Sequence, residues 1–578
     1  MGTLRMRRLI VLLVVWSVGT EVCAALRIEG LEPCEPWRAY KPQVWCMQVT
    51  GMGRELPTVV LNGSALATGS VTRMLDSLRF RLNQRQSVSG PIWLAADGQT
   101  SNGVWLTMGQ SRVVAAGQYP QIRLNDRVVT ALDLVSLVFR EDLDGLIQAQ
   151  RVARQYGLEI VGAIPPLNVY QVRLPVNSLE GRDILLATLG REAAIEGVVV
   201  EDDNLEMPAD PLRAIDPPDQ QGWIANRFLQ AVDLYTDYAV KAAQAHKLHT
   251  LLVGVIESGV NFDAGDFASY LVPCDSGQVC LYARHSRAAT HGTAVSGYLA
   301  AGAHPSANLG FLSRMGAAGG FRVIVDRGAR AGVAARVAAS VNLVQDGVRV
   351  LNWSWGVHRM GGINQRGEPI QANVRSDLAF NGYATLLKRF FAWLARNHPA
   401  VVVINSAGNS ASLTDQHLPA SLLADQLIVV GAHQRTGRDV DVEDAGFVAS
   451  RASSNVGQRV DITAAGCPPW ASSARAEPGG CGTSYAAALV TGAVAAMLSI
   501  DPELEPRQVR TLLRQSALPL ASGGTVDITL PLTSEERSIA GDSATGQSAR
   551  LNMQGALELV IVRRAAASVA GAQAPVSR

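Results

Sequence analysis

The stretch Cys-Gly-Thr-Ser-Tyr-Ala-Ala at residues 481–487 stands directly before small apolar residues that continue to Leu498. This pattern predicts a tightly packed, buried helix with Ser484 in its first turn. A hydroxyl at that position lies near free N–H groups and the positive end of the helix dipole, which stabilise a developing oxyanion. Serine is also a favoured N-cap, so this stretch alone supports a nucleophile and a simple helix cap equally.

Three stretches upstream of Ser484 contain the other groups that a serine nucleophile requires. His291 begins the stretch H-G-T-A-V-S-G, Asn409 ends the stretch N-S-A-G-N, and Glu257 follows an uncharged apolar segment. A serine hydroxyl is a weak nucleophile at neutral pH, and it needs a base, a group that orients the base, and donors for the oxyanion. The upstream stretches contain one candidate for each of these tasks.

In this order, the four stretches resemble the subtilisin-like serine peptidases, or subtilases. That family has an acid in D-[ST]-G, a histidine in H-G-T-H-V-A-G, an asparagine in A-G-N and a serine in G-T-S-x-A-A-P. Supporting segments at 350–356, 427–432 and 453–466 match as well, and the resemblance covers residues 225–562. It implies a peptidase that hydrolyses peptide bonds through an acyl-enzyme.

The resemblance also implies a role for each matching residue. Ser484 would be the nucleophile, His291 the general base and then acid, and Glu257 the carboxylate that orients the imidazole. The Asn409 amide would complete the oxyanion hole, although an asparagine in a left-handed turn is the alternative. Six residues would bind the substrate backbone: Ser354, Trp355, Gly356, Ser406, Ala407 and Gly408.

The sequence departs from the family pattern at the acid. Glu257 stands where the family has Asp, while Ala294 and Ala488 replace a second His and a Pro outside the proton relay. Glutamate is one methylene longer, and a displacement near 1 Å costs on the order of 10²-fold in rate. A catalytically silent binding protein with the same fold is therefore the alternative function. Asp263 and Asp266, in the loop that follows, are weaker candidates for the orienting acid.

The first 24 residues have the layout of a secretory signal peptide. Three arginines precede an apolar segment at 9–18, and Val-Cys-Ala at 22–24 ends the stretch. The apolar segment is too short for a mature membrane span. We therefore predict export, to the medium, the periplasm or the cell surface.

Six cysteines remain after removal of Cys23, and an oxidising compartment favours disulfides over free thiols. Six cysteines allow 15 pairings, which sequence alone does not resolve. They nevertheless fall into three local pairs, and we expect these to be bonded: Cys34 with Cys46, Cys274 with Cys280, and Cys467 with Cys481.

Two further domains are predicted before the peptidase-like region. Residues 26–108 contain short strands between Gly, Asn and Ser turns, which indicates an all-β sandwich that resembles an immunoglobulin-like IPT domain; another all-β accessory domain is the alternative. Residues 132–204 alternate strands with two helices. Their position resembles that of the family's inhibitory prodomain, with a generic α+β module as the alternative.

The remaining boundaries follow from composition. A Pro- and Asp-rich linker covers 205–222, and alternating strands and helices over 223–562 predict an α/β domain with a doubly wound, mostly parallel sheet. The Ala-rich end, 563–578, is predicted to be a disordered tail.

The amino-acid composition argues against some classes of binding partner. The formal charge is +1 with 17% charged residues, which argues against nucleic acid and anionic membranes as partners, and no apolar run is long enough for a membrane span. Polypeptide substrates and the chain's own prodomain are the expected partners. The chemistry requires no cofactor and no metal. Calcium is common in the family, but no complete carboxylate loop is present, and Asp266 is only a weak ligand candidate.

Overall fold

The computed structural model describes the chain in segments, and the predicted signal segment 1–24, residues 205–221 of the predicted linker and residues 573–578 lie outside them. The described residues are 25–35, 44–82, 88–114, 119–123, 128–204, 222–244, 249–257, 259–262, 267, 269–270, 274, 279–283, 290–302, 310–315, 320–326, 332–370, 376–467, 481–520 and 549–572.

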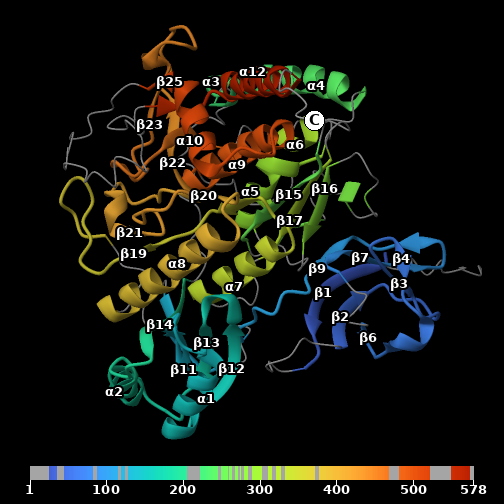
Figure 1. Cartoon of the computed structure of the whole chain (residues 1–578), viewed down its shortest axis with the longest axis vertical. Helices are drawn as coiled ribbons and strands as arrows, with labels where there is room; N and C mark the ends of the chain where they lie inside the picture. Colours follow the sequence, from blue (N-terminus) through green and yellow to red (C-terminus); the bar gives the residue numbers. More distant parts are fainter. Residues whose placement is uncertain are drawn as a thin grey trace, which may run out of the picture.

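One ten-stranded sheet forms the centre of the C-terminal half (Figure 1). Its strands are parallel from β16 to β26, and β25 and β23 are antiparallel to their neighbours. The prediction of a mostly parallel sheet is therefore confirmed. The strands, in sheet order, are β16 (Cys280–Ala283), β17 (Phe321–Val325), β15 (Leu251–Val255), β18 (Val350–Trp353), β20 (Val402–Ser406), β22 (Leu427–Arg435), β24 (Ile462–Ala465), β26 (Ala549–Arg550) and β25 (Leu518–Pro519), with β23 (Val448–Ser450) beside β22.

Helices cover both faces of this sheet, and each face has its own hydrophobic core. Alternation along β17 illustrates this, because Val323 and Val325 belong to one core and Ile324 to the other. One core contains residues of α4 (Phe228–Gln244), α5 (Thr290–Ala300), α6 (Phe311–Arg314), α9 (Thr483–Ile500), α10 (Pro506–Gln515) and α12 (Met553–Ala572). The other contains residues of α7 (Gly332–Gln345) and α8 (Asp377–Asn397). The sheet is doubly wound, as predicted.

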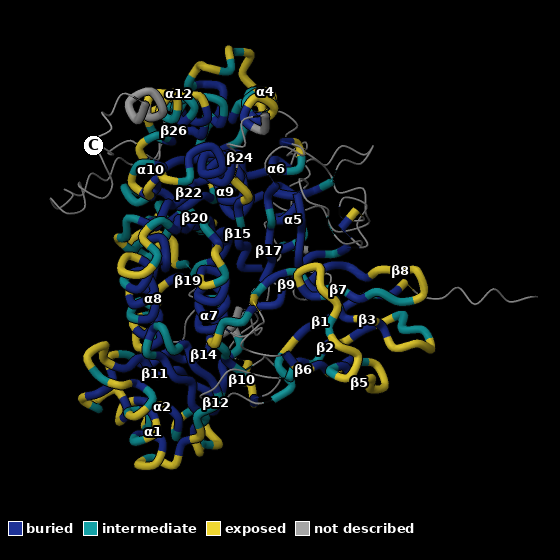
Figure 2. Tube along the Cα trace, turned by 45° about the vertical axis from the view of Figure 1, so that its right-hand side comes forward, coloured by how far each residue is buried: buried dark blue, intermediate teal, exposed yellow. Residues whose placement is uncertain are grey.

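Helix α9 is the innermost of these helices (Figure 2). Of the described residues, only those of α9 form a helix long and apolar enough to cross a membrane, and all of them are buried inside the fold. Its small side chains explain this close packing, since Gly492 already lies against the ring of Phe311.

The predicted start of the disordered tail is wrong. Helix α12 continues to Ala572, past the predicted boundary at 563. Alanine has the highest helix propensity, which favours helix over coil in this segment. Arg563 and Arg564 also pair with Asp501, at 3.5 and 3.3 Å, and so anchor the helix to the body of the fold.

Residues 121–204 form an antiparallel sheet with two helices, here called the module. Local signals determine where its helices begin, because Asp144 accepts from the Ile147 N–H and Ser178 from the Gly181 N–H. The elements are β10 (Gln121–Arg123), β11 (Val128–Phe139), α1 (Gly145–Tyr156), β12 (Glu159–Ile164), β13 (Val169–Arg173), α2 (Leu179–Leu189) and β14 (Ile195–Asn204).

Residues 25–108 form two antiparallel sheets around a separate apolar core, here called the sandwich. The all-β prediction is confirmed. One sheet contains β1 (Arg27–Pro33), β2 (Val44–Thr50), β6 (Ser77–Arg81) and β5 (Val71–Arg73). The other contains β4 (Ser64–Ala65), β3 (Thr58–Leu61), β7 (Gly90–Ala96), β8 (Gln99–Thr100) and β9 (Val104–Leu106).

The three predicted cysteine pairs are disulfide-bonded. Cys34–Cys46 joins residues near β1 and β2, Cys274–Cys280 lies beside β16, and Cys467–Cys481 closes the segment that leads into α9. Three bonds of this kind are typical of proteins from oxidising compartments.

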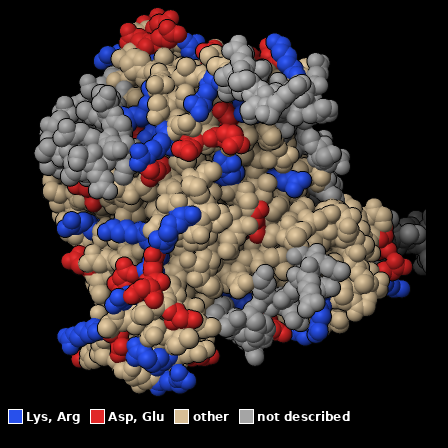
Figure 3. All heavy atoms as spheres, in the orientation of Figure 1, with Lys and Arg blue, Asp and Glu red and all other residues tan. Residues whose placement is uncertain are grey.

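The visible surface has charges of both signs. Figure 3 shows Lys and Arg interspersed with Asp and Glu on this face, most densely over the module and α8. This face has no broad basic area of the kind that nucleic acids bind.

Candidate active site

Four of the predicted residues lie on elements that meet at one edge of the large sheet. Glu257 follows β15 and Asn409 follows β20, while His291 and Ser484 lie in the first turns of α5 and α9. The carboxyl ends of parallel strands and the amino ends of their helices share the same edge of such a sheet. The alternative acids Asp263 and Asp266 lie outside the described residues.

Glu257 and His291 are in direct contact, with Glu257 Oε1 3.0 Å from His291 Nδ1. Glu257 is 8% exposed, whereas the imidazole is only partly covered. A carboxylate can accept only from a protonated Nδ1, so in the neutral ring Nε2 is the basic nitrogen. The longer acid therefore reaches the histidine in spite of the Asp-to-Glu departure.

Two residues that follow His291 explain this contact. A Cβ at Gly292 would overlap the carbonyl oxygen of Gly259, so only glycine lets α5 approach the loop after β15 so closely. The Thr293 hydroxyl accepts a hydrogen bond of 2.9 Å from the Asn261 N–H in the same loop. The Gly-Thr pair thus attaches the start of α5 to the segment that presents Glu257.

Ser484 is not a helix cap, which rules out the alternative left open above. Gly482 occupies the N-cap position of α9, and no side chain caps the helix. The Ser484 hydroxyl instead donates to the Ser354 carbonyl at 3.4 Å, and the Ser354 hydroxyl donates to the Ser484 carbonyl at 3.1 Å. Ser484 thus lies against the end of β18.

A buried series of side-chain hydrogen bonds supports the contact between Ser484 and Ser354. The Asn352 amide donates to the Ser354 hydroxyl at 2.8 Å, and the Thr491 hydroxyl donates to Asn352 Oδ1 at 3.0 Å. Thr491 lies two turns along α9 from Ser484. Hydrogen bonds therefore connect α9 to β18 and the residue after it at two places, through Ser484 and through Thr491. The sequence analysis did not identify Asn352 or Thr491; a polar residue inside each otherwise apolar segment was the available signal.

Helices α5 and α9 pack together close to His291. The His291 ring lies 6.1 Å from the ring of Tyr485, which in turn stacks on Tyr298 at 5.5 Å. Burial, and then the nearby Glu257 charge, raise the pKa of Tyr485, which keeps its phenol neutral. Tyr485 therefore fills the space beside the imidazole without adding a charge.

The Asn409 side chain is fixed through its oxygen. Oδ1 accepts from the Thr483 N–H at 2.9 Å and from the Thr483 hydroxyl at 3.1 Å. The Nδ2 hydrogens consequently point away from Thr483, and the side chain is exposed. The left-handed conformation suggested as an alternative belongs to Gly408 and Ala411, not to Asn409.

The loop around Asn409 is held by Asn455, from the predicted S-S-N segment. Its Oδ1 accepts from the Ser410 and Ser412 N–H groups, both at 3.0 Å, and its Nδ2 donates to the Ala407 carbonyl at 2.9 Å. Asn455 is thus a positioning residue that the motif itself could have identified.

The six predicted substrate-binding residues flank Ser484. Ser354, Trp355 and Gly356 follow β18, and Ser406, Ala407 and Gly408 lie at the end of the neighbouring β20. Trp353 and Trp355 are both buried, so neither indole forms the open surface. The Asn405 amide fixes the first segment by donating to both tryptophan carbonyls at 2.9 Å.

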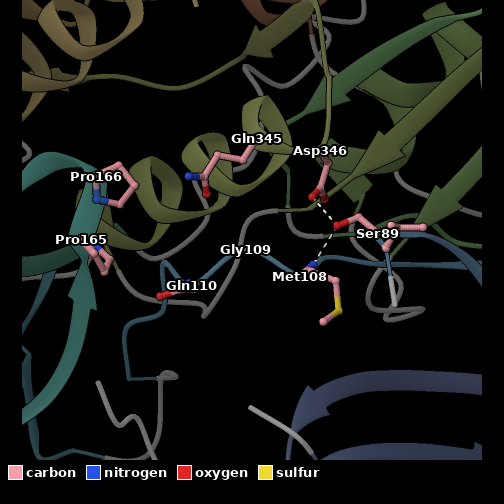
Figure 4. Close-up of a pocket in the computed structure, with 9 residues that line it drawn as sticks. Ser89, Met108, Gly109, Gln110, Pro165, Pro166, Gln345 and Asp346 are labelled. Atoms are coloured by element: carbon pink, nitrogen blue, oxygen red, sulfur yellow. Dashed lines mark hydrogen bonds between the residues drawn. The ribbon is translucent and has the colours of Figure 1, made fainter. Parts of the chain in front are cut away.

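No group of three or more His, Cys, Asp or Glu side chains that could hold a metal occurs in the described parts of the chain. The weak calcium candidate Asp266 is not among them. A cavity of about 650 Å³ lies elsewhere, where the sandwich, the module and α7 meet, and its lining contains none of the predicted site residues (Figure 4).

Solved structures of two known proteins are similar to parts of this chain. Fervidolysin from Fervidobacterium pennivorans, described as a keratinolytic enzyme related to subtilisin, is similar in structure at 18% identity and a TM-score of 0.44, over 78% of this chain and 65% of its own. The epidermin leader peptide processing serine protease of Staphylococcus aureus is similar at 15% identity and a TM-score of 0.43, over 74% of this chain and 98% of its own.

No curated relative matches the chain. The model of the subtilase family matches residues 249–556, which is more than half of the chain and includes all four candidate residues. The chain belongs to the subtilase family of peptidases.

Proposed function

We propose that the protein is an exported serine endopeptidase that is made as a self-processing zymogen and cleaves polypeptides through an acyl-enzyme. The observation that carries this proposal is the 3.0 Å contact between Glu257 and His291 Nδ1. The orienting acid was the role that the sequence left most open, because Glu257 stands where the family has Asp. Motif order and family membership support the remaining assignments.

In this mechanism His291 removes the proton of the Ser484 hydroxyl through Nε2 as the hydroxyl attacks the peptide carbonyl. Glu257 holds the required tautomer and stabilises the imidazolium. The Asn409 amide and the Ser484 N–H donate to the oxyanion. His291 then protonates the leaving amine, and water attacks the acyl-enzyme by the same path. No cofactor takes part in these steps.

A silent binding protein of the same fold is the second candidate, because the acid departs from the family and the Ser484 hydroxyl contacts the Ser354 carbonyl. Catalytic hydrogen bonds are often loose in the absence of substrate, so this contact agrees with either function. Reactivity at Ser484 distinguishes the two.

Labelling with an organophosphonate serine probe tests the assignment. The wild-type chain should be modified at Ser484, and His291→Ala should not. Glu257→Gln should slow turnover by about 10⁴-fold, because an amide can stabilise the wrong tautomer and cannot offset the imidazolium charge. Glu257→Asp should retain more activity than Glu257→Gln. Absence of labelling in the wild type would favour the silent protein, and full activity of Glu257→Gln would remove Glu257 from the mechanism.

Zymogen processing is the second part of the proposal. The position of the module before the peptidase domain and the three disulfides support a secreted precursor. Sequencing of the secreted wild-type protein should find a new N-terminus between Asn204 and Gly222. The Ser484→Ala chain, made in a host without other secreted proteases, should keep its N-terminal regions. Equal processing of both chains would contradict self-maturation.

A further inference from the structure

His417 lies between the two segments that flank Ser484. Two short strands, β19 (Val357–His358) and β21 (His417–Leu418), pair antiparallel so that His358 and His417 face each other. Their rings lie 4.5 Å apart. The first strand continues directly from Gly356, so this pairing brings His417 to the end of the predicted substrate-binding segment.

Two glycines mark how closely the imidazole approaches both segments. A Cβ at Gly356 would overlap Cε1 and Nε2 of His417. A Cβ at Gly408, which has a φ of +102°, would come 3.1 Å from the same Nε2. Gly356 therefore accepts no side chain while His417 is in place, Gly408 lies close to the same ring, and His417 is only 3% exposed. The imidazole therefore fills the space between residues 354–356 and 406–408.

The surroundings keep this ring neutral and fixed. Burial, and then the His358 charge, hold the pKa of His417 well below its usual range, and burial lowers the pKa of His358 to about 4. His358 Nε2 lies 2.8 Å from the Ser410 hydroxyl. Asn455, whose Nδ2 a Cβ at Gly408 would overlap, is the other polar group on this side. His417 is thus a buried, uncharged filling group at neutral pH.

The position of a substrate follows from the candidate site. The carbonyl attacked by Ser484 must also reach the Asn409 amide, and the residue that contributes this carbonyl lies between the two flanking segments when the peptide pairs along residues 354–356. Its side chain is therefore directed at the space that His417 occupies. A large side chain there would require displacement of a packed ring.

We propose that His417 limits the residue on the N-terminal side of the cleaved bond to a small side chain, so that the substrates are polypeptides cleaved after Gly, Ala or Ser. This inference rests on the proposed function. It goes beyond it by assigning the substrate class to one residue that the sequence analysis did not identify.

Peptides that differ only in this residue test the proposal on the secreted, processed wild-type protein. The kcat/KM for an Ala substrate should exceed that for a Phe substrate by at least about 100-fold. His417→Gly should raise the Phe-to-Ala ratio by at least about tenfold. The ratio does not depend on the fraction of active protein, so partial misfolding of the variant leaves it interpretable.

His433→Ala is the matched control. His433 is also a buried histidine, hydrogen-bonded to Thr463, but it lies in the part of β22 that pairs with β23 and β24 rather than with β20. Its loss should lower stability and leave the Phe-to-Ala ratio unchanged. Equal cleavage after Phe and Ala by the wild type would overturn the proposal even if His417→Gly failed to fold, and so would a preference for Asp or Glu.

Phosphonate probes with Ala and Phe side chains separate the two hypotheses. Modification of Ser484 by the Ala probe alone supports both. Equal modification by the two probes refutes the role of His417 and leaves the peptidase assignment standing. Failure of every probe and every peptide refutes the proposed function, and the proposal for His417 with it.

Discussion

The module and the sandwich both contact helix α7, but the module shares far more of its hydrophobic core with the peptidase domain. Residues of β11, β13 and β14 belong to the same apolar cluster as α7 and α8, whereas the sandwich encloses a separate cluster and adds Trp105, whose ring lies 5.7 Å from Tyr282, to the shared one. Figure 1 shows the module against α7 and α8 and the sandwich to one side, beside β16. The two regions are therefore attached by different forces.

The contact between β14 and α8 is close enough to require glycine on one side. A Cβ at Gly382 would overlap the carbonyl oxygen of Val198. One residue further along the helix, the Tyr383 hydroxyl donates to the Val200 carbonyl at 2.7 Å in a buried setting. This packing density is that of a protein interior rather than of a transient interface.

Arg389 is the polar centre of the module contact. Its guanidinium is 6% exposed and donates to the carbonyls of Phe139 and Leu167, at 2.9 and 3.2 Å. It also pairs with the partly exposed Glu141 and Glu196. A buried cation with this many partners holds the end of β11 and the start of β14 on α8 at the same time.

The sandwich is attached by hydrogen bonds at α7 and by the contact between Trp105 and Tyr282 of β16. Asp346, just after the helix, accepts from the Ser89 hydroxyl at 2.5 Å and from the Trp105 indole N–H at 2.9 Å (Figure 4). Asn342 exchanges two hydrogen bonds with the backbone of Ser111, three residues past the end of the sandwich. The cavity of about 650 Å³ lies directly beside these contacts. A cavity at an interface indicates looser packing than that of the module.

The difference bears on processing. Cleavage within 205–221 would remove the covalent connection of both regions to the peptidase domain. We expect the module to remain bound through the shared core, because its separation would expose a large apolar surface to water. The sandwich shares fewer apolar residues with the peptidase domain, so we expect polar contacts to contribute a larger part of its attachment.

Arg389→Ala, made in the Ser484→Ala chain to prevent self-cleavage, should have the largest effect on this comparison. The carbonyls of Phe139 and Leu167 would lose their donor inside the contact, which should lower the free energy that holds the module by about 3 kcal/mol. Hydrogen exchange of the β14 amides should accelerate by roughly 100-fold, while exchange within the sandwich core should not change.

Arg396→Ala is the control for charge alone. Arg396 forms two hydrogen bonds with Glu141, at 2.7 and 3.0 Å, on the surface of the same helix. Exposed pairs of this kind contribute at most about 1 kcal/mol. If the Arg396 and Arg389 variants loosened β14 equally, burial would not explain the strength of the module contact.

Local sequence signals predicted the helices and strands better than they predicted the contacts between these elements. An N-cap acts within one turn, so Asp144 and Ser178 determine locally where α1 and α2 begin. Strand β12 was missed, since its register shifts between Ile160 and Gly162 and this interrupts the two-residue alternation. Helix α4 was also missed, although its buried positions recur at three- and four-residue spacing and could have been recognised.

The same limit applies at the candidate site. Short motifs predicted the residues that meet at the sheet edge, because these motifs occur along the sequence in the same order as in the family pattern. The sequence analysis gave no role to His417, whose position depends on the pairing of two two-residue strands from distant segments. The tight fit of Gly356 against it also appears only in three dimensions. Contacts of this kind are set by tertiary packing and leave no local periodicity.

Asp346→Asn should have a smaller effect, confined to the sandwich. Asparagine has nearly the same shape, but Ser89 and Trp105 donate to different oxygens of Asp346 and an NH2 group would replace one of them, so the sandwich contact should weaken by about 1–2 kcal/mol. A double-mutant cycle with Trp105→Phe, which removes the indole N–H together with part of the ring, should give a coupling energy of about 0.5 kcal/mol or more. Exchange of the β14 amides should stay at its wild-type rate in both variants. Simple additivity would show that this hydrogen bond does not hold the sandwich, and loosening of β14 would show that the two regions are attached as one unit rather than separately.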